Sequence, residues 1–164
     1  MKKDKDEDLD LDEYQDAKEN EIALVTHERI NQGMCGEIMK HEIGYVELRL
    51  ETLHEMLADD IGLIHGGFIF SAADYAAMAA VNEKNVVLVA SDCQFLSPVK
   101  YHDEVNFIAK VRHKEGRKRN VHVEGYVLEI KVFEGEFKTV ITDKHILKLH
   151  LIDDDEAEQN EIRG

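Results

Sequence analysis

The sequence predicts an α+β fold in which an antiparallel sheet curls around one long central helix. The segment from Gly67 to Asn82 is apolar on every face, so the helix that it forms has to be covered on most sides. A strand-like segment precedes this helix and four more follow it, joined by links of hairpin length, which favours a sheet wrapped around the helix. A short N-terminal helix and acidic tails complete the expected architecture.

The strands are expected where apolar and polar side chains alternate. Before the long helix, Val46, Leu48 and Leu50 alternate with polar side chains, which indicates a half-buried strand. Gly116 and Gly135 are expected to mark hairpin turns between later strands. The expected strand-like segments cover residues 35–51, 85–95, 104–113, 119–133 and 137–151.

Two other segments have less regular patterns. Residues 16–31 are expected to form the short N-terminal helix, because apolar side chains recur at roughly helical spacing and Gly33 follows to end it. Residues 52–63 are expected to form a polar connection or short helical turn that leads into the long helix.

The charge of the chain is concentrated at its two ends. The whole chain carries −15, of which residues 1–21 hold −6 and residues 153–164 hold −5. We therefore expect a single domain over residues 22–152 between two disordered acidic tails. An acidic surface disfavours nucleic acid as a partner, because that binding depends on basic side chains that displace counterions.

Composition also predicts a cytoplasmic protein without a membrane span. The acidic start lacks the apolar stretch of a secretory signal, and two cysteines are too few for a disulfide framework. Residues 61–82 are apolar enough to resemble a membrane span, but Asp74 lies near their middle and Gly66 and Gly67 lie near one end. A buried helix explains this segment better.

Asp74 is the first candidate for a catalytic group. It lies seven residues into the apolar helix, and burying an unpaired carboxylate is costly, so the chain needs either partners for it or a use for it. Burial should raise its pKa toward neutrality, which suits a general base. A hydrogen-bonded structural acid is the alternative interpretation.

The turn His65-Gly66-Gly67 directly before the helix is the second candidate. Glycine lets a ligand approach the backbone there, and the first-turn N–H groups of a helix have no partners within the helix. Such donors, aided by the helix dipole, suit a carbonyl oxygen that becomes an oxyanion during attack on an ester or thioester. His65 either donates a hydrogen bond or stiffens the turn, and an ordinary tight turn is the alternative.

The spacing of these two candidates predicts a site shared between chains. Seven residues at about 1.5 Å each separate Gly67 and Asp74 by about 10 Å along one helix axis, so one carbonyl cannot touch both. If both act in one reaction, the donor comes from one chain and the acid from another. This requires a homodimer, or a dimer of dimers, with antiparallel helices.

Three motifs together resemble a known family. His65-Gly66-Gly67 is followed by Phe70-Ser71-Ala72-Ala73-Asp74 and by a strand that ends in Phe95-Leu96-Ser97-Pro98. Over residues 45–150 the sequence is similar to the hot-dog superfamily, and most similar to its phenylacetyl-CoA thioesterase type. The resemblance implies an acyl-CoA thioesterase with sites between subunits, in which coenzyme A enters only as part of the substrate and no other cofactor is needed.

The resemblance also implies roles for individual residues. Asp74 would activate water or attack the thioester, and the Gly67 N–H would polarise the thioester carbonyl. Six residues before the histidine, where the family often has asparagine, this chain has Asp59. A carboxylate brings charge in place of a neutral amide, and Asp59 is counted with His65 among the catalytic candidates.

A second resemblance leads to a different function. Residues 118–137 and 95–99 are similar to the effector domain of the hot-dog repressor that senses malonyl-CoA, which binds acyl-CoA without hydrolysing it. The alternative function is therefore a non-catalytic acyl-CoA-binding sensor or regulatory protein.

Basic side chains gather in one expected hairpin of this acidic chain. Coenzyme A carries several phosphate charges, and a basic loop at the mouth of an acyl tunnel would hold them, although an ordinary solvated turn is the alternative. The candidates for binding coenzyme A are Gly66, Arg112, Lys114, Arg117, Lys118 and Arg119. The nine histidines include no HExxH motif and no clustered Cys/His spacing, so no metal site is expected.

Overall fold

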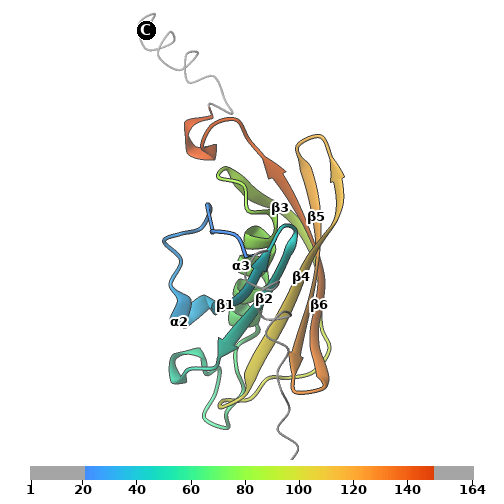
Figure 1. Ribbon diagram of the computed structural model, residues 1–164. Helices are drawn as coiled ribbons and strands as arrows, with labels where there is room; N and C mark the ends of the chain where they lie inside the picture. Colours follow the sequence, from blue (N-terminus) through green and yellow to red (C-terminus); the bar gives the residue numbers. More distant parts are fainter. Residues whose placement is uncertain (1–20, 150–164) are drawn as a thin grey trace, which may run out of the picture.

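A computed structural model describes residues 21–149 of the chain. Within these residues, six strands form one antiparallel sheet in the order β1-β2-β4-β5-β6-β3, and the long helix α3 packs against one face of it (Figure 1). The elements are α2 (Gln32–Cys35), β1 (Glu37–Glu42), β2 (Tyr45–Glu51), η1 (His54–Met56), α3 (Gly66–Val81), β3 (Val86–Phe95), β4 (Glu104–Glu115), β5 (Lys118–Val127), β6 (Ile130–Ile141) and η2 (Ile146–Lys148). The tails expected at residues 1–21 and 153–164 lie outside the described part of the chain, except for Glu21.

Helix α3 occupies the segment that the sequence predicted to be a buried helix. Six of its alanines are buried, and the small side chains let the sheet approach the helix closely, while Tyr75 and Met78 fill the space between them. The helix ends at Asn82, which adopts the left-handed conformation with φ 49°. Among the described residues, no helix is long and apolar enough to span a bilayer.

The strands under the helix alternate as the sequence predicted. In β2 and in the first half of β4, residues 104–109, every second side chain faces α3 and is fully buried, and the intervening side chains face the opposite side of the sheet. These buried side chains are Val46, Leu48, Leu50, Val105, Phe107 and Ala109. The α+β hot-dog architecture is confirmed, and η1 provides the helical turn expected within residues 52–63.

The single strand expected over residues 35–51 is wrong, because this segment is a hairpin. The chain reverses between β1 and β2 at Gly44, whose φ of 71° favours glycine, and the two strands pair antiparallel. The alternation that predicted the strand, Val46, Leu48 and Leu50, lies entirely in β2, whereas β1 has no regular alternation of apolar side chains.

The boundary expected between the last two strands is also wrong. Gly116 does form the turn between β4 and β5, but the next reversal lies at Leu128, not at Gly135. Gly135 lies inside β6, where an added Cβ would come within 2.8 Å of Cys93 Sγ, so glycine permits close packing there. Strand β6 ends at Ile141, and the short turn η2 follows where the strand was expected to continue.

The N-terminal helix is shorter than expected and lies later in the chain. Residues 21–31 are not helical, and α2 begins only at Gln32 and includes Gly33, which was expected to follow it. Tertiary contacts explain the difference: Val25 N–H donates to Asn82 Oδ1 at 2.8 Å, and Asn82 Nδ2 donates to the carbonyl oxygen of Ala23 at 2.9 Å. These bonds hold the segment extended beside the C-terminal end of α3.

Candidate functional site

The first turn of α3 presents two free backbone donors. No described residue accepts a hydrogen bond from the N–H group of Gly66 or Gly67, whereas the Phe68 N–H donates to the His65 carbonyl oxygen at 3.1 Å. The imidazole of His65 lies over Gly67, since an added Cβ at Gly67 would be 2.8 Å from His65 Nε2. Both His65 and Gly67 are exposed, so the donors are accessible to a ligand.

Asp74 lies two turns further along the same helix. Its side chain is half-buried among the buried alanines, and Oδ1 is inaccessible to solvent and has no hydrogen-bond partner among the described residues. Burial raises the pKa of Asp74 from 3.8 to about 6. A carboxyl group with this pKa is largely ionised at neutral pH and can accept a proton there.

Strand β3 lies beside this carboxyl group. Cys93 faces the helix from β3, and the pKa of its thiol is raised first by burial and also by the nearby charges of Asp92 and Asp74, although Ser91 lowers it through a hydrogen bond. A thiol with a raised pKa is a poor nucleophile at neutral pH. The raised pKa of Cys93 thus makes this thiol a weaker candidate for chemistry at the site than Asp74.

Asp59 lies in the exposed loop before α3 and orders that loop. Its Oδ1 accepts hydrogen bonds from the N–H groups of Ile61 at 2.9 Å, Gly62 at 2.9 Å and Leu63 at 3.1 Å. The Leu63 and Gly62 N–H groups are the main reason why the pKa of Asp59 is lowered. Asp59 thus remains ionised and positions the backbone that leads to His65.

An apolar cavity opens at the N-terminal end of α3. It has a volume of about 320 Å³, and its walls include Gly66, Ile69, Phe95, Val99 and Val132. Gly66, one of the two residues with a free N–H group, is therefore part of the wall of this apolar cavity. The sequence analysis did not predict this chamber, although it singled out the motif Phe95–Pro98 that forms one wall.

The basic side chains lie at the opposite end of the helix. The β4–β5 hairpin brings Lys114 and Arg119 to a second cavity at the C-terminal end of α3. This cavity is also lined by Val81, the last residue of the helix, and by Asn82, which follows it. A helix of 16 residues is about 24 Å long, so within one chain these groups do not reach the His65 turn. Arg117 pairs with Asp143 at 2.6 Å.

The remaining basic candidates are also accounted for. Arg119 Nη1 donates to the carbonyl oxygens of Gly116 at 2.7 Å and Lys118 at 2.9 Å, which stiffens the hairpin. Arg112 and Lys118 are exposed. The structure therefore brings together His65, Gly66 and Gly67, places Asp74 about 10 Å away on the same helix, and keeps the basic hairpin apart.

Strand β3 forms one open edge of the sheet. Its residues from Val89 to Asp92 are exposed, and Val89 itself is 58% exposed. A strand of ten residues with free backbone groups on one side and exposed apolar side chains is a surface that pairs readily with another strand.

Comparison with known proteins identifies relatives of this chain. The family model of the thioesterase superfamily matches residues 61–134, which include the His65 turn, α3 and β3. The uncharacterized protein PH1136 from Pyrococcus horikoshii is 41% identical, with a TM-score of 0.77 and coverage of 78% of this chain and 98% of that one. The sigma28-regulated virulence protein Cj0977 from Campylobacter jejuni is 41% identical, with a TM-score of 0.73 and coverage of 75% of this chain and 95% of that one.

The chain spans only part of the curated relatives that it matches. It is 54% identical over 119 residues to a methylthioribose-1-phosphate isomerase of Aquifex aeolicus, a match that covers 73% of this chain and 26% of that protein. It is 27% identical over 116 residues to the transcription factor FapR of a Thermoanaerobacter species, which covers 70% of this chain and 58% of that protein. The FapR match agrees with the second resemblance found in the sequence.

More distant structures share the fold. The PaaI protein of E. coli, from the phenylacetic acid degradation operon, is 23% identical with a TM-score of 0.64, covering 70% of this chain and 84% of that one. The protein smu.793 of Streptococcus mutans, solved with acetyl CoA bound, is 23% identical with a TM-score of 0.64, covering 73% and 97%.

Proposed function

The chain belongs to the thioesterase superfamily, and we propose that it hydrolyses an acyl-CoA thioester. One observation supports this most directly: a half-buried carboxyl group with a pKa of about 6, Asp74, lies on the same helix as the free N–H group of Gly67. The acetyl CoA bound to the S. mutans protein of this fold supports the same class of ligand.

Each group has a defined part in the proposed reaction. The Asp74 carboxylate accepts a proton from a water molecule, whose oxygen attacks the thioester carbonyl carbon. The Gly67 N–H donates to the carbonyl oxygen, which carries the negative charge of the tetrahedral intermediate. Collapse of that intermediate breaks the carbon–sulfur bond, and the protonated Asp74 gives its proton to the departing sulfur, so that a carboxylic acid and the thiol of coenzyme A are released and the carboxylate is regenerated.

The reaction requires two chains, because Gly67 and Asp74 are about 10 Å apart on one helix. We propose a homodimer, alone or within a dimer of dimers, that forms by antiparallel pairing of two β3 edges. The exposed apolar side chains of β3 support this pairing. A two-fold axis there sets the two α3 helices antiparallel, so that Asp74 of one chain approaches Gly67 of the other.

The same dimer gives the cavity and the basic hairpin their places. The apolar chamber beside Gly66, with a volume of about 320 Å³, suits the acyl part of the substrate. Antiparallel helices bring the hairpin of the second chain, with Lys114 and Arg119, toward the His65 turn of the first, where it would neutralise the phosphates of coenzyme A.

We also propose a cytoplasmic location. The two cysteines are free thiols, which persist in a reducing compartment, and the proposed acyl-CoA substrate is consistent with the same compartment.

Thiol release from a panel of acyl-CoA esters tests the proposal. We expect turnover by the native protein and a loss of at least about 100-fold in kcat for Asp74→Asn, in the range typical of a removed general base. Asp60→Asn, which removes an exposed carboxylate from the preceding loop, is the matched control and should keep full activity. Absence of thiol release for every chain length contradicts the hydrolase.

A non-catalytic acyl-CoA sensor is the second candidate, favoured by the match to FapR and by Asp59 in place of the family's amide. It predicts that acyl-CoA raises the melting temperature without thiol release, and that Asp74→Asn keeps this thermal shift. An Asp59→Asn variant separates the two further, because a gain of thiol release in that variant would identify Asp59 as the block to turnover.

A further inference from the structure

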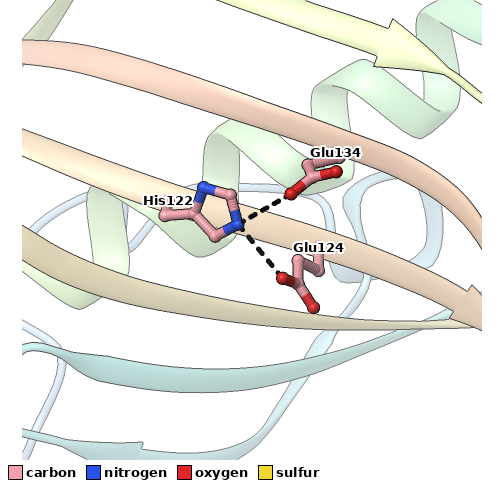
Figure 2. A group of neighbouring side chains, drawn as sticks. All are labelled: His122, Glu124 and Glu134. Atoms are coloured by element: carbon pink, nitrogen blue, oxygen red, sulfur yellow. Dashed lines mark hydrogen bonds and ion pairs between the residues drawn. The ribbon is translucent and has the colours of Figure 1, made fainter.

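A histidine and several carboxylates meet on the face of the sheet that is opposite α3. Val121 and Val123 are fully buried beneath the helix, so His122 between them points to the other face. The register of β5 and β6 pairs His122 with Glu136 and Glu124 with Glu134, which places all four polar side chains on this outer face. Figure 2 shows His122, Glu124 and Glu134 turned toward one another, with α3 behind the strands.

The imidazole of His122 is unusually buried for an outer-face side chain. The residue is only 8% exposed, and its Nε2 lies 3.1 Å from Glu124 Oε1 and 3.2 Å from Glu134 Oε1 (Figure 2). Its Nδ1 forms a hydrogen bond with Glu136 Oε1. Because a carboxylate only accepts hydrogen bonds, we assign the ring hydrogen to Nδ1, which leaves the Nε2 lone pair facing two carboxylate oxygens.

This arrangement needs a positive charge between Nε2 and the two carboxylates. A proton on Nε2 would supply it, and so would a metal ion. In metal sites, the ring nitrogen of a histidine that does not bind the metal usually donates a hydrogen bond to a carboxylate or a carbonyl group, as Nδ1 of His122 does to Glu136. This hydrogen bond fixes the ring orientation and makes Nε2 a stronger ligand for the metal.

The distances fit a metal ion. The three donor atoms lie within 4.8 Å of one another, and the two edges at Nε2 measure 3.1 and 3.2 Å. Bonds of about 2.0–2.1 Å at angles near 100° produce edges of this length. One imidazole nitrogen with carboxylate oxygens suits a first-row divalent transition metal such as zinc better than magnesium or calcium, which prefer oxygen alone.

We infer that His122, Glu124 and Glu134 form a binding site for a divalent transition-metal ion, with Glu136 as the positioning residue for the imidazole. The site is separate from the proposed hydrolysis, because the sheet lies between it and Asp74. An ion bound there would fasten β5 to β6. Sequence spacing did not predict it, since the ligands lie on two strands and meet only through their register.

Lys131 provides the sharpest test of this inference. Its Nζ lies 3.5 Å from Glu124 Oε1 and 3.6 Å from Glu134 Oε2, so its charge partly neutralises the same carboxylates that would bind the ion. Removing this ammonium group leaves those carboxylates free for the ion. A purely structural ion-pair cluster has no reason to bind metal more tightly after that change.

The experiment is a zinc titration of the untagged full chain, first freed of metal with a chelator, followed by calorimetry and by thermal melting. We expect one saturable zinc ion per chain whose affinity falls by about 10- to 100-fold in Glu136→Gln, falls further in His122→Gln, and rises in Lys131→Met. Zinc should raise the melting temperature of the native chain but not of His122→Gln. His113→Gln is the matched control, because this exposed histidine also pairs with a glutamate, Glu115 at 3.8 Å.

A double variant tests the same inference if His122→Gln folds poorly. The double variant Glu124→Gln with Glu134→Gln changes only side chains that are partly exposed, at 26% and 38%, and should abolish saturable binding while keeping the fold. The inference is overturned if the native chain shows no saturable zinc binding below millimolar concentration, if the affinity is unchanged in His122→Gln, if saturable binding survives in the double variant, or if Lys131→Met weakens it.

Discussion

Replacing Asp74 by asparagine should stabilise the fold at neutral pH while it removes activity. The native chain keeps a half-buried carboxyl group whose pKa is raised from 3.8 to about 6 by burial. Because the folded pKa lies above the unfolded one, the folded state holds the proton more tightly, and ionisation of Asp74 destabilises it. The native chain therefore loses stability as the pH rises from about 4 to above 6, and the asparagine variant lacks this loss.

The magnitude follows from the size of the pKa change. A rise from 3.8 to about 6 corresponds to roughly 3 kcal/mol between the two protonation states. Because part of the side chain remains in solvent and the asparagine amide still lacks a partner, we expect a net gain of about 1–2 kcal/mol at pH 8. For a domain of this size that gain raises the melting temperature by roughly 3–8 °C.

The assay is urea unfolding at fixed protein concentration, carried out at pH 8 and again at the lowest pH at which the chain stays folded, near pH 4. We expect the advantage of Asp74→Asn to be present at pH 8 and nearly absent near pH 4, where the native carboxyl is protonated in the folded state. Asp60→Asn, which removes an exposed carboxylate, should change stability by less than about 0.5 kcal/mol. Equal stability of native and Asp74→Asn chains at pH 8, or an advantage of the same size at both pH values, would refute the reasoning.

Three more predictions concern the helix turn, the pH profile and the strand glycine. The kcat/KM for thioester hydrolysis should rise through an apparent pKa near 6 and level off above it, since Asp74 must be ionised to accept a proton; a flat profile from pH 5 to 8 contradicts this role. Gly67→Ala should lower kcat by at least about 10-fold with little change in melting temperature, because its Cβ, 2.8 Å from His65 Nε2, displaces an exposed ring and crowds the oxyanion donor; activity unchanged in this variant argues against the donor. Gly135→Ala should destabilise the chain by about 1–3 kcal/mol in urea unfolding, because its Cβ would lie 2.8 Å from Cys93 Sγ, and adding Cys93→Ala should recover part of the loss.

Local patterns predicted the central helix and the position of its candidate groups. An apolar segment with one acid and a glycine pair before it is recognisable in any context, because the apolar character of the segment and the unpaired first-turn N–H groups of a helix depend on the local sequence only. The same holds for the alternation of Val46, Leu48 and Leu50, which placed the correct side chains against the helix before the strand ends were known.

Contacts between distant segments explain where the sequence misled. Asn82 holds Val25 and Ala23 in an extended conformation, which overrides the weak helical pattern of that segment. Gly135 has the composition of a turn but serves close packing against Cys93. In both cases a tertiary contact outweighs a local preference that is worth little by itself.

By itself the sequence determined the fold class, the buried nature of α3, the buried face of β2, and the pair Gly67 and Asp74 with their separation along the helix. The tertiary structure alone decided that the basic hairpin lies at the far end of α3, that an apolar chamber opens beside Gly66, and that His122 meets Glu134 across two strands. The reason is that strand register and turn position set which distant residues become neighbours, and a repeat of two residues along each strand is compatible with many registers.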